Sequence, residues 1–132
     1  MDKKNKDQLE TLRVPLRIVF YKDDDTTVVA HCLEFDLIGH GDTHEQAIES
    51  LCNAINIQVE ETLETGNVEN LFNPAPGEYF RMFAAGQSSQ RVGKAVGEVK
   101  IKIHHIGNMD FNEVDGREYV GSDQHDDMCA AV

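Results

Sequence analysis

The sequence lacks most of the features by which enzymes and membrane proteins are recognised. It contains no apolar stretch long enough to span a bilayer, and residues 1–7 are polar and are not followed by the apolar core of a signal peptide. It also lacks a glycine-rich phosphate loop and a serine in a nucleophile elbow. We therefore expect a cytoplasmic protein that is not an enzyme and that needs no cofactor.

Cysteine is scarce, and its three positions do not form a pattern. Cys32, Cys52 and Cys129 are odd in number and far apart, which argues against a disulfide framework and fits a reducing compartment. We expect Cys52 to be a buried residue of a helix. We expect Cys129 to be exposed.

The six histidines do not follow the spacing of a metal site. His31 and Cys32 are neighbours in a predicted strand, so their side chains point to opposite faces and cannot share an ion. His40 and His44 flank a predicted helix start with Asp42 between them. We expect the histidines to be exposed or hydrogen-bonded, and we predict no metal site.

Basic residues are also few, since 12 Lys and Arg stand against 24 Asp and Glu and leave a formal charge of −12. This balance disfavours nucleic-acid binding, which depends on Lys and Arg contacts to phosphates. An acidic surface can instead steer a basic protein partner, although it can also serve solubility alone. The candidate interface residues lie in an acidic turn and on a helix: Asp23, Asp24, Asp25, Glu45 and Glu49. Their alternative roles are a solvated hairpin turn and a solvated helix face.

Three strands are predicted in the first third of the chain. Residues 11–21 place apolar side chains on one face at a period of two, and Pro15 suggests an edge position or a strand start. A polar turn at 22–25 joins this strand to a second at 26–33, as an antiparallel hairpin. A third short strand is expected at 36–40.

A long helix is predicted over residues 43–65. Its start is marked by Gly41, Asp42, Thr43 and Gln46, in which Thr43 and Gln46 form a capping box. Apolar residues then recur at three- and four-residue spacing, and Gly66 is expected to end the helix.

The second half of the chain has weaker signals. Residues 77–86 suggest a short helical turn whose aromatic side chains pack on the sheet or on a neighbouring subunit. Alternating residues at 98–106 predict a fourth strand. We therefore expect a disordered N-terminus at 1–10, one domain at 11–106 and a poorly ordered acidic tail at 107–132. The fold class is α+β, a three- to four-stranded antiparallel sheet crossed by one long helix in the order β-β-β-α-β.

Two short motifs in this frame resemble a known family. Residues 30–37, Ala-His-Cys-Leu-Glu-Phe-Asp-Leu, are followed by Gly41-Asp42-Thr43-x-Glu45-x-Ala47. This arrangement, over residues 12–76, resembles the N-terminal domain of the HicB-like antitoxin family. The resemblance implies a shape related to a truncated ribonuclease H fold, self-association, and masking of a small basic ribonuclease of the HicA type. The C-terminal third lacks the pattern of the DNA-binding domain that such antitoxins usually add.

Two functions follow as hypotheses. The first is a non-enzymatic HicB-like protein-binding module, a dimer or tetramer that masks a small basic toxin. The alternative is an orphan homo-oligomeric domain with a structural or small-molecule-binding role and no toxin partner.

Overall fold

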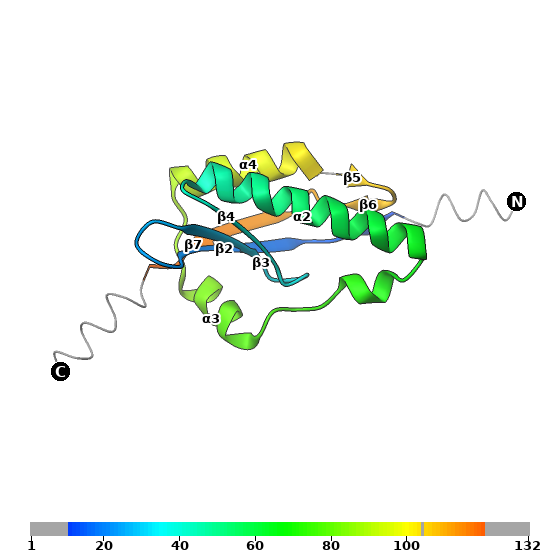
Figure 1. Ribbon diagram of the computed structural model, residues 1–132, viewed down its shortest axis with the longest axis horizontal. Helices are drawn as coiled ribbons and strands as arrows, with labels where there is room; N and C mark the ends of the chain where they lie inside the picture. The colour runs from blue at the N-terminus through cyan, green and yellow to red at the C-terminus, as the bar shows by residue number, and fades with distance from the viewer. Residues whose placement is uncertain (1–10, 104, 121–132) are drawn as a thin grey trace, which may run out of the picture.

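A four-stranded sheet forms the centre of the molecule (Figure 1). The computed structural model describes residues 11–103 and 105–120. The strands of the sheet, in spatial order, are β4 (Leu37–Gly41), β3 (Val28–Cys32), β2 (Leu16–Lys22) and β7 (Val114–Glu118). The pairs β2–β3 and β3–β4 are antiparallel, whereas β7 runs parallel to β2. The α+β class and the first three strands are therefore confirmed, and the fourth strand makes the sheet mixed rather than antiparallel.

Strand β2 begins directly after Pro15, because proline has no amide hydrogen to donate to the ladder. Before Pro15, β1 (Leu12–Arg13) pairs instead with β6 (Met109–Asp110), which also pairs with β5 (His105–Ile106). The inward face predicted for residues 11–21 is correct. Its members are all buried in the main core: Val14, Leu16, Ile18 and Phe20.

Helix α2 (His44–Thr65) crosses one face of the sheet, as predicted. Gly66 follows it in the left-handed conformation, with φ of 75°, and its amide donates to the Thr62 carbonyl. The buried side of α2 includes Leu51, Ile55 and Val59. These residues pack with the sheet in the main core.

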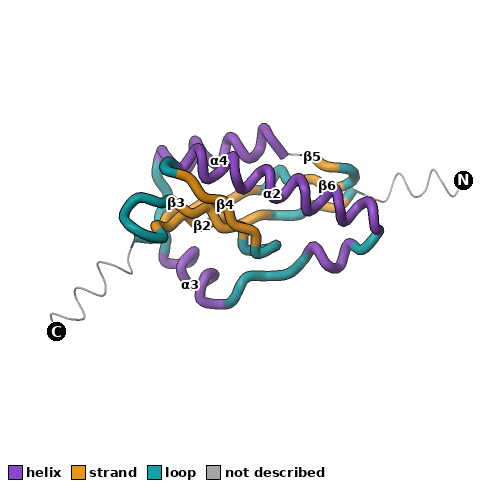
Figure 2. Tube along the Cα trace, in the orientation of Figure 1, coloured by secondary structure: helices purple, strands orange, loops and turns teal. Residues whose placement is uncertain are grey.

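A second helix, α4 (Gln90–Ile103), lies beside α2 on the same face of the sheet (Figure 2). The strand predicted at 98–106 is wrong for residues 98–103, which belong to α4; His105–Ile106 is extended as β5 but belongs to the smaller sheet with β6 and β1. The alternation of Val99, Ile101 and Ile103 suggested a strand, but Val99 and Ile103 are buried whereas Ile101 is 74% exposed. The buried residues Val92, Ala95, Val99 and Ile103 follow the helical spacing of three and four.

The opposite face of the sheet carries α3 (Gly77–Ala85), which follows the short helix η1 (Val68–Leu71). Of the two expected positions for its aromatic side chains, the sheet is the one observed. Phe83 is buried with Val19 and Leu33, and several partly buried side chains pack around them: Tyr21, Tyr79, Phe80, Met82 and Tyr119.

The expected lack of order from Gly107 onward is wrong for residues 107–120. These residues form β6 and β7, and β7 pairs with β2 over five residues, from Leu16↔Val114 to Phe20↔Glu118. Gly116 lies close below α4, where a Cβ atom would lie 2.5 Å from Val96 Cγ2. The predictions for residues 1–10, for His104 and for residues 121–132, including Cys129, lie outside the described residues.

Candidate functional site

The acidic turn between β2 and β3 exposes all three of its aspartates. Asp24 has a structural role, because its Oδ1 accepts hydrogen bonds from Thr26 N (2.9 Å), Thr27 N (2.8 Å) and Thr26 Oγ1 (3.1 Å). The backbone bond from Thr26 is the main reason why the pKa of Asp24 is below its ordinary value. The carboxylate of Asp24 thus closes the turn, and those of Asp23 and Asp25 extend the acidic surface.

Glu45 and Glu49 are exposed near the start of α2. The start of α2 and the acidic turn lie toward the same end of the molecule (Figure 1). Glu45 lines an open hollow together with Arg91 and Lys94 of α4, so its charge has basic neighbours. The acidic end is therefore not uniformly negative.

The helix start is built as a tight unit. Thr43 Oγ1 accepts from Gln46 N at 3.1 Å, and Gln46 Oε1 accepts from Asp42 N at 2.8 Å. In a standard capping box this second bond goes to the cap residue, whereas here it goes to the residue before it. Gly41 lies so close that an added Cβ would be 2.4 Å from Gln46 Cβ. The packing of the helix start onto β4 thus requires glycine at that position.

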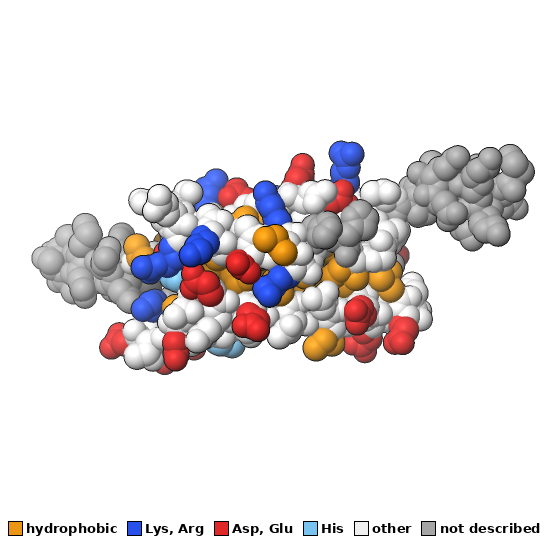
Figure 3. All heavy atoms as spheres, turned by 90° about the horizontal axis from the view of Figure 1, so that it is seen from above, with side chains coloured by type: hydrophobic (Ala, Val, Ile, Leu, Met, Phe, Trp, Pro, Cys, Tyr) orange, Lys and Arg blue, Asp and Glu red, His pale blue; other side chains and the backbone are white. Residues whose placement is uncertain are grey.

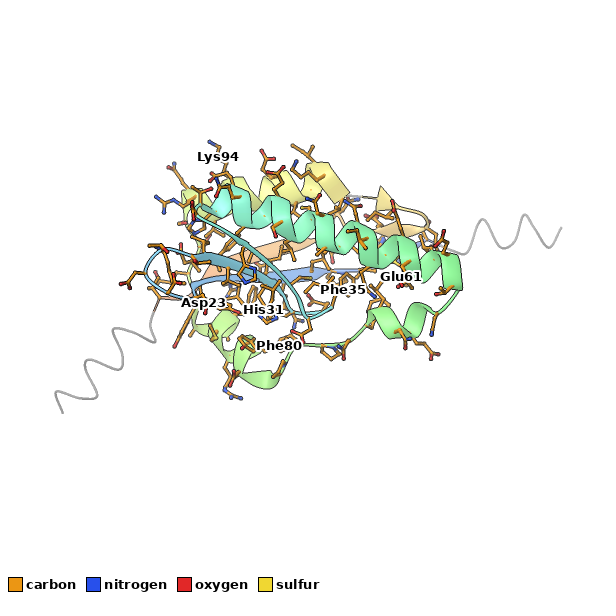
Figure 4. The ribbon with its side chains drawn as sticks, in the orientation of Figure 1. Asp23, His31, Phe35, Glu61, Phe80 and Lys94 are labelled. Carbon is orange, nitrogen blue, oxygen red and sulfur yellow. The ribbon has the colours of Figure 1, made fainter. Side chains whose placement is uncertain are left out.

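A buried polar cluster lies on the α3 side of the sheet. His31, in β3, is 1% exposed, and both of its ring nitrogens have partners. Nε2 is 2.7 Å from Asp36 Oδ1, and Nδ1 is 3.2 Å from the Tyr21 hydroxyl. The ring of Tyr79 from α3 lies against His31, with 4.6 Å between centroids. Figure 4 shows His31 pointing from the sheet toward the layer that holds Phe80.

The hydrogen bonds of this cluster suit a structural role better than a catalytic one. In the tautomer that carries its proton on Nε2, His31 donates to Asp36 Oδ1 and accepts at Nδ1 from the Tyr21 hydroxyl. Burial raises the pKa of Tyr21 from 10.0 to about 12, so its hydroxyl remains a hydrogen-bond donor into the alkaline range. Asp36 has φ of 55° in the turn that joins β3 to β4, a conformation uncommon outside glycine. We infer that the cluster holds this turn in place.

The sequence did not predict this cluster, although the strand pairing contains its signal. His31 stands opposite Val19 in the β2–β3 ladder, which places Tyr21 diagonally across from it on the same face. Asp36 follows at the end of a tight turn. No single one of these residues is marked in the sequence as part of a site. Only the register of the β2–β3 hairpin brings Tyr21 and His31 together.

The structure does not bring His40 and His44 together at one ion. His44 is buried, its ring lies 5.0 Å from that of Phe20, and its Nε2 is 3.3 Å from Glu118 Oε2 without the geometry of a hydrogen bond. His40 is exposed on β4. Within residues 11–103 and 105–120, no three His, Cys, Asp or Glu side chains are grouped so that they could hold a metal ion.

Comparisons with protein-family models, with curated proteins and with solved structures give no match. In the described part of the chain, no helix combines the length and the apolar character needed to cross a membrane. The resemblance to the HicB-like family therefore depends on the residues of the β3 strand, the turn and the helix start.

Proposed function

We propose that the chain is a HicB-like protein-binding module that masks a small basic partner, a ribonuclease of the HicA type. The observation that carries the proposal is the single packed unit formed by β3, the turn, β4 and the Thr43 cap. The residues that resemble the family lie in this unit. Gly39 gives an example, since an added Cβ would lie 2.3 Å from both Ala47 O and Leu51 N of α2.

The strand order supports the same proposal. Strands β2, β3 and β4 are consecutive and antiparallel and are followed by helix α2, and β7 later pairs in parallel with β2. This order agrees with the truncated ribonuclease H shape that the resemblance implies. This agreement supports the fold only. The nature of the partner is inferred from the exposed surface.

The surface offers an acidic end and a free strand edge. Asp23 and Asp25 are exposed at the hairpin, and Glu49 is exposed near the start of α2. Strand β4 has no neighbour on its outer side among the described strands, although the His40 amide there donates to Ser50 Oγ at 3.2 Å. Exposed acidic groups steer a basic protein into place, and an unpaired edge can take up a strand of that protein.

The proposal is tested by recovery of the tagged chain from a lysate of its native host at low salt, with mass spectrometry of what co-elutes. We expect a small basic protein in about equal amount that cleaves RNA once separated from the chain. We also expect rising salt to release it, because salt screens the attraction between exposed charges. Recovery of the chain alone, as an oligomer, contradicts the proposal.

One observation favours the alternative, an orphan homo-oligomeric domain with a structural or small-molecule-binding role. Strand β7 occupies the edge of β2 that a partner strand would otherwise use, and it does so over five residue pairs. Sheet edges tend to be covered so that they do not pair with other chains. A stable oligomer without a basic partner in the same experiment supports this alternative.

A further inference from the structure

Two isoleucines lie on the solvent-exposed side of their helices. Ile57 in α2 is 66% exposed and Ile101 in α4 is 74% exposed, more than any other large apolar side chain in the described residues. The residues two positions before and two positions after each isoleucine are buried. Two residues rotate a side chain by more than half a turn around the helix axis. Both isoleucines therefore point away from the sheet, on the outer surface of the layer that α2 and α4 form.

The exposed charges of α4 and of the second half of α2 are opposite in sign, although the partly exposed Glu98 of α4 lies three positions before Ile101. Ile57 and its acidic neighbours Glu60, Glu61 and Glu64 line one open hollow on the second half of α2. The exposed cations of α4 are Arg91, Lys94, Lys100 and Lys102. Figure 4 shows Lys94 projecting away from the sheet. Figure 3, which looks down on the molecule from above, shows that Asp and Glu lie along the whole visible face and that Lys and Arg project between them.

Two glycines add an independent observation on α4. Gly93 and Gly97 precede Ile101 at four-residue spacing, so the three lie on one stripe of the helix. A Cβ atom added at either glycine would meet nothing within 4 Å. Glycine inside a helix costs about 1 kcal/mol relative to alanine. The fold of one chain gives no reason for this cost, whereas a second helix lying against the stripe does.

We propose that a second copy of this chain docks here, with the outer face of α2 from each copy against the outer face of α4 from the other. A two-fold axis makes each contact twice. Ile57 then meets the glycine stripe and Ile101, and Glu60 and Glu64 meet Lys94 and Lys100. The acidic residues differ from those of the proposed toxin surface, so this dimer does not depend on the toxin-masking function.

The test uses charge reversal on the full chain, with mass measured by sedimentation equilibrium. Wild-type protein is expected to dimerise. The variants Glu60→Lys/Glu64→Lys and Lys94→Glu/Lys100→Glu are each expected to raise the dimer dissociation constant at least about tenfold, because each places like charges at both contacts. A mixture of the two variants is expected to form a one-to-one heterodimer, because both contacts then become attractive again.

The control matched to Glu60→Lys/Glu64→Lys is Glu69→Lys/Glu113→Lys, which changes the net charge by the same amount at exposed positions outside the proposed contact. This control is expected to dimerise like the wild type. A monomeric wild type overturns the proposal, and so does reversal of both patches without effect. Failure of the two reversed variants to pair with one another also overturns it. If Glu60→Lys/Glu64→Lys loses a basic partner while the wild type is monomeric, this acidic face serves that partner and the dimer is wrong.

A second variant separates docking from folding. Gly93→Gln/Gly97→Gln places two larger side chains, both better helix formers than glycine, in open space. We expect the monomer to unfold at a higher temperature and the dimer to dissociate at a higher concentration. Dimerisation equal to that of the wild type contradicts a contact at the stripe.

Discussion

His31 shows how one residue connects three elements. Its strand supplies the ring, the turn after β3 supplies Asp36, and β2 supplies Tyr21. A buried imidazole costs free energy unless both nitrogens have partners, and here both do. We infer that this cluster sets the position at which β3 turns into β4, and through β4 the start of α2.

The variant Asp36→Ala tests this inference. It removes the acceptor of a buried donor and places a residue with a Cβ but no local hydrogen bond at a φ of 55°. We expect the free energy of unfolding, measured with urea, to fall by about 1–3 kcal/mol. Asp36→Asn is the control, since its amide oxygen still accepts from His31 and asparagine tolerates this conformation. An equal loss in both variants, or no loss in either, contradicts the inference.

The protons on two buried thiols and on one partly buried phenol make the stability depend on pH in the alkaline range. Burial raises the pKa of Cys32 from 9.0 to about 12, that of Cys52 from 9.0 to about 11 and that of Tyr21 from 10.0 to about 12. The folded protein keeps these protons longer than the unfolded chain does as pH rises. Their contribution is therefore complete below pH 9 and is lost between pH 9 and 12.

We expect the urea midpoint to fall steadily through that range. The variant Tyr21→Phe is expected to start from a lower midpoint, because it loses the bond to His31, and to fall less steeply above pH 10. A midpoint that does not change from neutral pH to pH 11 would show that these groups titrate alike in both states. Parallel curves for the variant and the wild type would exclude Tyr21 as a contributor.

At the scale of the element, α4 shows how helix and strand patterns can be confused. Val99, Ile101 and Ile103 alternate, and Lys100 and Lys102 between them complete the pattern of a half-buried strand. The helical pattern is seen only when Val92 and Ala95, which precede this segment, are included and Ile101 is treated as exposed. Ile101, which made the segment resemble a strand, is the residue that we place at a dimer contact.

The variants Ile103→Ala and Ile101→Ala distinguish the two patterns with the same substitution. Ile103 is 1% exposed, so its truncation leaves a cavity and is expected to cost about 2–4 kcal/mol. Ile101 is outside the core, and its truncation is expected to change the stability of the monomer by less than about 0.5 kcal/mol. Urea unfolding at protein concentrations below the dimer range measures both. Similar losses in the two variants would contradict a helix here.

Glycines in β4 and α4 allow a second matched pair. At Gly39 an added Cβ would lie 2.3 Å from backbone atoms of α2, so Gly39→Ala must push the helix off the strand. We expect a loss of about 1–3 kcal/mol or more by urea unfolding. At Gly93 the space is open, and Gly93→Ala is expected to gain about 0.5–1 kcal/mol. If Gly39→Ala is neutral, the close approach of β4 and α2 is wrong.

The local elements were more predictable than their partners in the sheet. Helix caps, turns and one-sided apolar patterns are formed by residues close together in the sequence. The strands β2, β3 and β4 and the helix α2 could therefore be predicted. The pairing of β2 with β7 joins residues far apart in the sequence, and β7 itself has few apolar residues, reading Val-Asp-Gly-Arg-Glu. The His31 cluster was missed for a related reason, because Tyr21 reaches His31 only through the strand register.

At the scale of the whole molecule, the charge of −12 is unevenly distributed. Asp23, Asp25 and Glu49 mark one end, while the cations of α4 lie beside Glu45. Exposed charges of this kind act mainly on the rate of association, which steering raises and salt lowers.

The variant Glu45→Ala/Glu49→Ala is therefore expected to slow association with a basic partner several-fold at low salt and to weaken the salt dependence of that rate. Stopped-flow fluorescence measures the rate, and Glu69→Ala/Glu113→Ala serves as a control with the same charge change elsewhere. An association rate equal to that of the wild type at low salt would remove Glu45 and Glu49 from the steering surface.

The most direct test of the central claim is a titration of the partner's activity. The small basic protein that co-purifies with the chain is separated from it, and its cleavage of RNA is measured as purified chain is added back. We predict that cleavage falls to background at about one chain per partner molecule. Cleavage that continues unchanged in the presence of excess chain would contradict a masking function.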